Sequence, residues 1–180
     1  MYRIQKKDND KRHRVSRAVL SLLDGDPEAP VIMCVGSTGA AGDALGPIVG
    51  ELLTGKFNIK AYVYGTVKRP LTALTLLDTY NFIKRFHGSV KVIVVDASLG
   101  SEEEKGSIII KPEGIKPGAA LNKELPLLGD YSITANVGAK ADNNMAALLT
   151  APKAVVCELA ENIAFGISDA LKLQGALAIC

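Results

Sequence analysis

The sequence of 180 residues contains no tryptophan, and aromatic residues make up only 5% of it. It has two histidines, His13 and His87, and three cysteines, Cys34, Cys157 and Cys180. An odd number of cysteines without Cys-x-x-Cys spacing argues against a disulfide framework and against a zinc site, and two of the three lie in apolar runs typical of reduced thiols. Two scattered histidines give no support to a Ser-His-Asp or Cys-His catalytic group.

Charge of one sign and long apolar runs are also missing. The net charge of +2 is too small to predict nucleic-acid binding, although basic residues cluster near the start of the chain. No run approaches the ~20 apolar residues that span a bilayer, and 18–23 is far shorter than the apolar core of a signal peptide. We therefore expect a cytoplasmic protein without nucleic-acid or membrane partners. Residues 1–10 are predicted to be a disordered basic tail, and residues 11–180 to form one domain.

The remaining sequence alternates between strand and helix patterns. Short runs rich in β-branched residues predict strands at 31–35, 59–64, 90–95, 106–111 and 129–137. Helical spacing of apolar residues predicts helices at 11–24, 44–54, 70–86, 140–149 and 153–173. This order predicts an α/β fold, in which a mostly parallel sheet lies between helices on both faces as a three-layer sandwich.

Two acids follow predicted strands. Asp43 comes after the first strand and a glycine-rich turn, immediately before a helix, and Asp96 closes the apolar run of the third strand. Ligands of a doubly wound sheet bind outside the carboxyl ends of its strands, so we expect both acids to flank one crevice if these strands are neighbours. The residues expected to bind substrate there are Gly36, Gly42, Gly65, Thr66, Ser98, Asp130 and Ser132, with Asn136 on the same strand face as Ser132.

The acids allow more than one chemistry. Two close carboxylates share a proton, so one can accept a proton from water while the other donates one to a substrate. The same pair could instead hold a divalent cation. In a non-catalytic alternative, Asp43 caps the following helix, Asp96 caps a turn, and the chain is a binding or regulatory protein. The spacing Gly36-x-x-Gly39-x-x-Gly42 is neither G-x-G-x-x-G nor a Walker loop, which argues against a nucleotide site.

Four stretches of the chain resemble the YyaC-type sporulation proteins of spore-forming Firmicutes in order and spacing. They are GDALGPIVGELL at 42–53, VYGT at 63–66, VIVVDASLG at 92–100 and PGAALNKELPLLGDYSITANVG at 117–138. That family is grouped with the germination protease, and more distantly with hydrogenase-maturation endopeptidases of the HybD kind, on a phosphorylase/hydrolase-like fold. The positions that match the catalytic aspartates of the germination protease are Asp43 and Asp96.

The resemblance implies a sporulation-associated peptidase in the forespore or mother cell, without a required cofactor. It implies a protein or peptide substrate, for which small acid-soluble spore proteins are the analogy, and it leaves a homo-oligomer open. The chain departs from the family in one loop, where Thr38, Gly39, Ala40 and Ala41 replace the usual Asp-Arg-Ser-Thr. HybD-type enzymes bind nickel through two acids and a histidine, but residues 129–138, where the histidine is expected, contain none. The missing histidine argues against nickel, and a metal-assisted endopeptidase with Asp43 and Asp96 as the carboxylate ligands is kept as an alternative.

Overall fold

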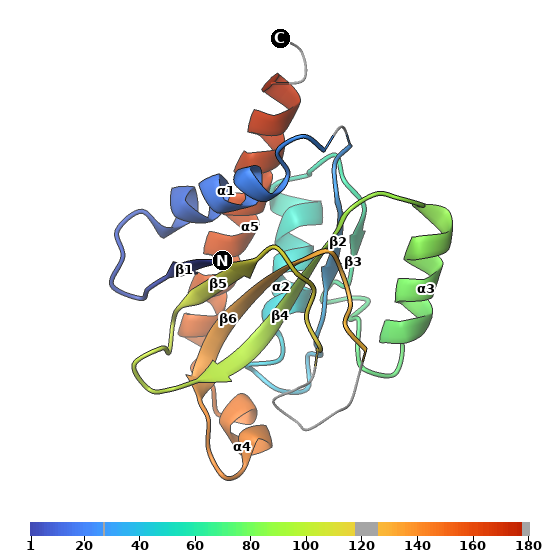
Figure 1. The fold of residues 1–180 in the computed structure, drawn as a ribbon. Coiled ribbons are helices and arrows are strands. Elements are labelled where there is room, and N and C mark those ends of the chain that lie inside the picture. The colour runs from blue at the N-terminus through green and yellow to red at the C-terminus, as the bar shows by residue number, and fades with distance from the viewer. Residues whose placement is uncertain (27, 118–125, 178–180) are drawn as a thin grey trace.

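The computed structural model describes residues 1–26, 28–117 and 126–177 of the chain (Figure 1). Its strands are β1 Tyr2–Ile4, β2 Val31–Cys34, β3 Val63–Tyr64, β4 Val92–Gly100, β5 Ile108–Lys111 and β6 Tyr131–Ala139. Its helices are α1 Lys11–Leu22, α2 Leu45–Glu51, the π-helical turn η1 Leu52–Lys56, α3 Leu76–Phe86, α4 Asn144–Leu149 and α5 Lys153–Leu177. Every strand and helix predicted from residue 11 onward overlaps one of these elements.

The strands form a single sheet in the order β1-β5-β6-β4-β2-β3. The four strands β3, β2, β4 and β6 run parallel, whereas β5 is antiparallel to β6 and β1 is antiparallel to β5. Strands β2 and β4 are neighbours, as the placement of the two acids required. The predicted α/β fold, with a mostly parallel sheet between helices, is confirmed (Figure 1).

One face of the sheet is covered by α1, α2 and α5 (Figure 1). Alternate residues of the central strands point to this face because side chains of a strand alternate between its two sides. Those residues belong to one apolar cluster with the inner sides of the three helices; in the sheet they are Ile32, Cys34, Ile93, Val95, Ile133, Ala135 and Val137. This larger part of the core fixes the strands that carry the candidate site.

The opposite face is covered over only part of its width. Helix α3 packs Leu76 and Ile83 against Val31, Met33 and Val94 of β2 and β4. In the part of the chain that the structure describes, no helix lies over this face at β6, β5 and β1 (Figure 1). Polar side chains of β4 and β6 can therefore reach a surface groove there instead of a second apolar core.

The predicted disordered tail at residues 1–10 is wrong at its start. Tyr2–Ile4 forms β1, whose residues pair with Ile108–Ile110 of β5, and the Ile4 side chain is buried in the larger core. A three-residue edge strand has too short a pattern to be recognised alone, because its partner lies about a hundred positions further along the chain. No helix within the described residues is long and apolar enough to cross a membrane.

Candidate functional site

The loop after β2 is held closed by Gly36. Its φ of +140° lies in a region that side-chain-bearing residues avoid, and a Cβ atom there would lie 2.0 Å from the carbonyl oxygen of Asp43. The amide of Gly36 donates to the Leu71 carbonyl at 3.0 Å, and the amide of Ser37 donates to the Asp43 carbonyl at 3.2 Å. Gly36 therefore brings the backbone of Asp43 back to the carboxyl end of β2.

The half-buried Asp43 side chain is oriented by its own loop. Ser37 Oγ donates a hydrogen bond to Asp43 Oδ2 at 2.6 Å. Helix α2 has Ala44 at its cap position, and no side chain among the described residues makes a cap hydrogen bond there. The helix-cap interpretation of Asp43 is therefore wrong, and its carboxylate lies beside the loop ahead of the helix.

Asp96 does not close its strand, because β4 continues to Gly100. The residue pairs with Thr134 of β6, and its side chain is 7% exposed. Asp96 Oδ1 accepts the amide hydrogen of Ala97 at 2.8 Å. This hydrogen bond offsets part of the cost of burying a carboxylate. Because side chains alternate along a strand and Asp96 pairs with Thr134, Asp96 lies on the same face of the sheet as Ser132, Thr134 and Asn136 of β6.

Backbone pairing places both acids at one edge of the sheet. The amide of Val35 donates to the Val95 carbonyl at 2.8 Å, and the register of β2 with β4 places Val35, the residue before Gly36, level with Asp96. Gly36 is in turn packed directly on the Asp43 backbone. Asp43 thus lies at the carboxyl end of β2 as expected, whereas Asp96 lies within the neighbouring parallel strand β4, four residues before its end.

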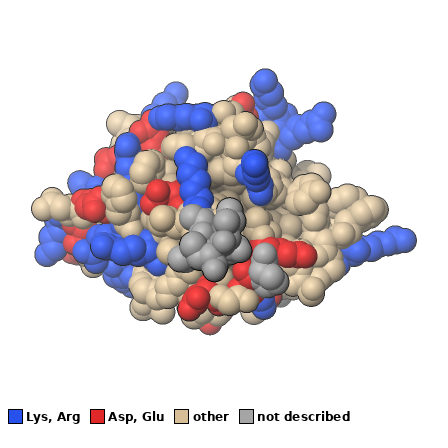
Figure 2. Space-filling view, turned by 90° about the horizontal axis from the view of Figure 1, so that it is seen from above, with Lys and Arg blue, Asp and Glu red and all other residues tan. Residues whose placement is uncertain are grey.

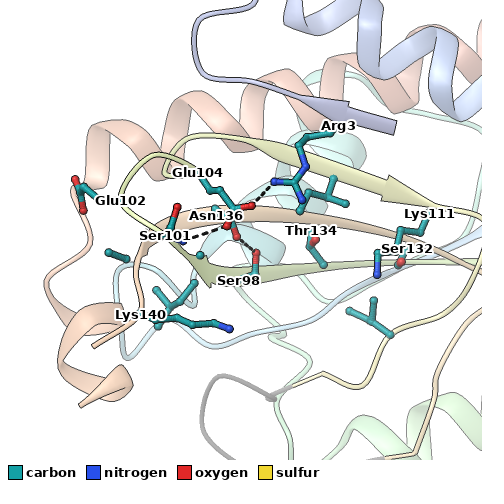
Figure 3. Close-up of a pocket in the computed structure, with 15 residues that line it drawn as sticks. Arg3, Ser98, Ser101, Glu102, Glu104, Lys111, Ser132, Thr134, Asn136 and Lys140 are labelled. Carbon is teal, nitrogen blue, oxygen red and sulfur yellow. Dashed lines mark hydrogen bonds and ion pairs between the residues drawn. The ribbon is translucent and has the colours of Figure 1, made fainter. Parts of the chain in front are cut away.

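A groove with a volume of about 700 Å³ lies on the open half of the sheet (Figure 3). Its floor includes Ser98 of β4 and three residues from one side of β6, namely Ser132, Thr134 and Asn136. Thr134 pairs with Asp96, so this polar row passes directly beside the buried carboxylate. Ser98 and Ser132, both expected to bind substrate, both line this groove, four residue levels apart along the sheet.

The floor of the groove is fixed by a hydrogen-bonded chain. Ser98 Oγ donates to Asn136 Oδ1 at 2.5 Å, and Asn136 Nδ2 donates to Ser107 Oγ at 3.0 Å. A β-bulge follows immediately, because Ser98 pairs with Asn136 whereas Leu99 pairs with Gly138. Such bulges redirect side chains next to binding sites, and here the bulge ends the polar row of β6 at Asn136.

Charged residues form the rim of the groove. Arg3 of β1 forms an ion pair with Glu104, and the backbone amide of Ser101 also donates to Glu104 (Figure 3). These hydrogen bonds, that from Arg3 first, hold the pKa of the Glu104 carboxyl below its ordinary value. Lys111 and Lys140 lie further along the rim (Figure 3). A polar floor between charged edges is suited to an extended, hydrogen-bonding ligand.

Three further predicted binding residues have structural roles, as Gly36 does. The amide of Gly42 donates to the Leu148 carbonyl at 2.8 Å, and a Cβ on Gly65 would lie 2.0 Å from the Cys34 carbonyl oxygen. Thr66 Oγ1 accepts the amide hydrogen of Arg69 and so closes its own turn. The surrounding backbone leaves no room for a side chain at Gly65, whereas a Cβ on Gly42 would lie 3.0 Å from both the Leu148 carbonyl oxygen and Val137 Cγ2, which is a tight contact.

The expectation that Asp130 lines the crevice is wrong. Asp130 precedes β6, and its carboxylate accepts the amide hydrogen of Val92 at 2.8 Å, at the start of β4. It lies four positions before Thr134, which at ~3.3 Å per residue is roughly 13 Å from the Asp96 level of the sheet. Asp130 thus anchors the amino ends of two parallel strands.

The histidine and acidic side chains of the described residues are not arranged as a metal site of two acids and a histidine. His13 pairs with Asp10, and His87 Nε2 is 2.8 Å from the Tyr64 hydroxyl, so neither histidine joins Asp43 or Asp96. Within the described residues no group of three or more His, Cys, Asp or Glu side chains is placed to hold an ion. Cys34 is buried, which raises the pKa of its thiol, whereas Cys157 is exposed.

Sequence reasoning missed Thr134, Arg3 and Lys140. The alternation of β6 contained the signal for Thr134, because it shares a strand face with Ser132 and Asn136. Arg3 carried no such signal, since its place in the groove depends on the pairing of β1 with β5. Most of the groove therefore comes from strand faces that the sequence shows only once the sheet order is known.

Known proteins resemble this chain at both the sequence and the structural level. It is 35% identical over 138 residues to "Uncharacterized protein YyaC" of Bacillus subtilis (strain 168), covering 77% of this chain and 67% of that protein. Its fold is similar to that of the NiFe hydrogenase maturation protease HycI from Thermococcus kodakarensis KOD1, with a TM-score of 0.58, 21% identity, and coverage of 86% of this chain and 98% of the other.

These relatives confirm the resemblance to YyaC-type proteins and to the fold of hydrogenase-maturation proteases. Residues 3–166, which span every element from β2 to α4 as well as the groove, match the family described as "Protein of unknown function (DUF1256)". The chain belongs to this family.

Proposed function

We propose that this protein is a peptidase in which Asp43 and Asp96 share a proton and activate water against a peptide bond. The observation that carries the proposal is the position of the buried Asp96. It is level with Val35, the residue after which the loop that carries Asp43 begins. The fold similarity to a maturation protease supports the reaction class. The resemblance to the germination protease supports the same two acids.

The proposed reaction needs one ionised and one protonated carboxyl group. The ionised acid removes a proton from water as the water oxygen attacks the carbonyl carbon of the substrate. The protonated acid then donates its proton to the leaving amine as the C–N bond breaks. Ser37 acts as a positioning residue, because its hydroxyl donates to Asp43 Oδ2 and holds that oxygen in one orientation.

The groove supplies a binding place for an extended peptide. Ser132, Thr134 and Asn136 stand on alternate positions of β6, roughly 7 Å apart, which matches the spacing of alternate residues in an extended chain. Their hydroxyl and amide groups can hydrogen-bond to peptide groups. By analogy with the germination protease, we propose small acid-soluble spore proteins as substrates and the forespore or mother cell as the location.

The test is cleavage by the purified full chain of proteome-derived peptides and of intact small acid-soluble spore proteins, with products identified by mass spectrometry. Asp43→Asn and Asp96→Asn should each reduce turnover by at least ~100-fold, because an amide can neither accept nor donate the required proton. The matched control is Asp78→Asn, on an exposed turn of α3. The thermal midpoints of all variants are measured in parallel.

The outcomes separate the proposed dyad from its alternatives. Full turnover in either Asn variant contradicts the dyad. Activity that a chelator removes and a divalent cation restores favours two carboxylate ligands with water completing the metal shell. If neither peptides nor spore proteins are cleaved but a peptide still binds, the non-catalytic binding protein is favoured.

A further inference from the structure

A second cavity, of about 1030 Å³, lies at the opposite end of the sheet from Asp43 and Asp96. Its walls come from the end of α1, the last turns of α5, the loop around Asp24 and the segment from Phe57 to Lys60. The two connecting segments precede β2 and β3, so they lie at the amino ends of the parallel strands. The cavity is therefore separate from the candidate peptidase site.

The interior of this cavity is largely apolar. Side chains from three segments line it: Leu20, Leu23, Phe57, Ile59 and Leu171. Leu23 is fully buried, whereas the other four lie partly exposed at the margin of the larger core. Pockets of several hundred to about a thousand Å³, lined by apolar and aromatic groups with a few polar atoms, are typical of small-molecule sites.

One polar atom in the cavity wall has no partner. Ser168 of α5 is 1% exposed, and its hydroxyl makes no hydrogen bond to any described part of the chain. Buried hydroxyl groups are nearly always hydrogen-bonded, because leaving one unpaired costs its full desolvation.

Basic side chains surround the opening. Arg17, Lys60 and Lys172 line the cavity, and none of them forms an ion pair with the described residues. Two acids, Asp24 and Asp26, also line the cavity, and Asp26 accepts a hydrogen bond from the Tyr131 hydroxyl at 3.3 Å. The three cations outnumber these two carboxylates by one. The view onto this end of the molecule shows Lys and Arg spread over the surface with Asp and Glu between them (Figure 2).

We propose that this cavity binds a small amphipathic anion, with its apolar body against Leu23, Phe57 and Leu171 and its anionic group at Arg17, Lys60 and Lys172. Each feature of the cavity matches one part of such a ligand. The apolar walls match the body, and the three cations without an ion pair match the head group. This inference is independent of the proposed peptidase activity.

The first experiment titrates the full chain with dansyl-undecanoate and follows its fluorescence. We expect saturable binding that decanoate displaces, and decanoate should also raise the thermal midpoint. Decylamine has the same apolar chain with the opposite charge, and should displace the probe at least ~10-fold less well, about the effect of one lost charge-assisted contact.

Two variants locate the site. Gly175 lines the cavity, and a Cβ atom added there would meet nothing within 4 Å, so Gly175→Trp adds bulk without a backbone clash. The second variant replaces Arg17, Lys60 and Lys172 together by Gln. Each should weaken decanoate binding by about tenfold or more. The matched control replaces the exposed lysines Lys7, Lys84 and Lys153, which lie outside this cavity, by Gln.

The proposal is overturned if the probe does not bind saturably, or if decylamine competes as well as decanoate. It is also overturned if both variants bind decanoate like the unaltered chain, because binding would then occur elsewhere. A loss of affinity in the control triple variant equal to that of the cavity triple variant would show that net charge alone attracts the probe, and this too would overturn the assigned site.

Discussion

At the scale of single residues, glycine determines the geometry around Asp43. Gly36 combines a φ of +140° with a Cβ position only 2.0 Å from the Asp43 carbonyl oxygen. Gly36→Ala should therefore reduce the free energy of unfolding by about 2–4 kcal/mol, through backbone strain and forced displacement of the loop. Urea denaturation of the full chain measures this change.

The matched control for that substitution lies in the same loop. A Cβ on Gly39 would meet only Ser37 Oγ, at 3.8 Å, and Gly39 has no positive φ. Gly39→Ala should change the free energy of unfolding by less than about 1 kcal/mol. Equal effects of the two substitutions would show that Gly36 does not hold the loop against Asp43 in solution.

The same scale shows what the sequence could predict of the candidate site. Asp43 and Asp96 were identifiable because strand ends and turns are local patterns. Asp130 follows a turn glycine in a similar way, yet it lies at the other end of the sheet. Local sequence places a residue near a strand end, and the sheet order and register then decide which residues share a groove, as they do for Thr134 and Arg3.

At the scale of elements, strand β1 predicts that the first residues of the chain contribute to the stability of the fold. Ile4 is 2% exposed and belongs to the larger core, so Ile4→Ala should lower the free energy of unfolding by about 2–4 kcal/mol. A disordered tail would show no change. Chemical denaturation gives the value, and Lys7→Ala, at an exposed position outside the strand, should leave the stability within about 0.5 kcal/mol.

Helices and strands with long apolar patterns were predicted more accurately than short strands. The strands β2 and β4 were recognisable because their apolar runs are buried on both faces, and α5 because its apolar spacing extends over many turns. The pattern at 59–64 predicted a full strand, but only Val63 and Tyr64 pair with β2. Short edge strands depend on one neighbour, so their limits are set by tertiary pairing more than by their own residues.

At the scale of the whole molecule, the sheet is unequally covered, and the two candidate sites lie at opposite ends of it. Helices α1, α2 and α5 cover one face, whereas α3 covers the other face only at β2 and β4. The open half accommodates the groove, and the amino ends of the strands accommodate the second cavity. The groove is lined mainly by β1, β4, β5 and β6, whereas the second cavity is lined by helix ends and the loops between elements.

This arrangement predicts how protection from hydrogen exchange is distributed. Strand β4 is bonded to β2 and β6 and is buried on both faces from Val92 to Asp96, so its amides should exchange only through global unfolding. Strands β1 and β3 have one neighbour each and should open locally. Exchange measured by NMR should give protection at least ~100-fold higher in β4 than in β1. Equal protection would contradict this and would mean that β1 opens only when the whole core unfolds. The rim of the groove at Arg3 would then be as resistant to local opening as β4, which carries Asp96.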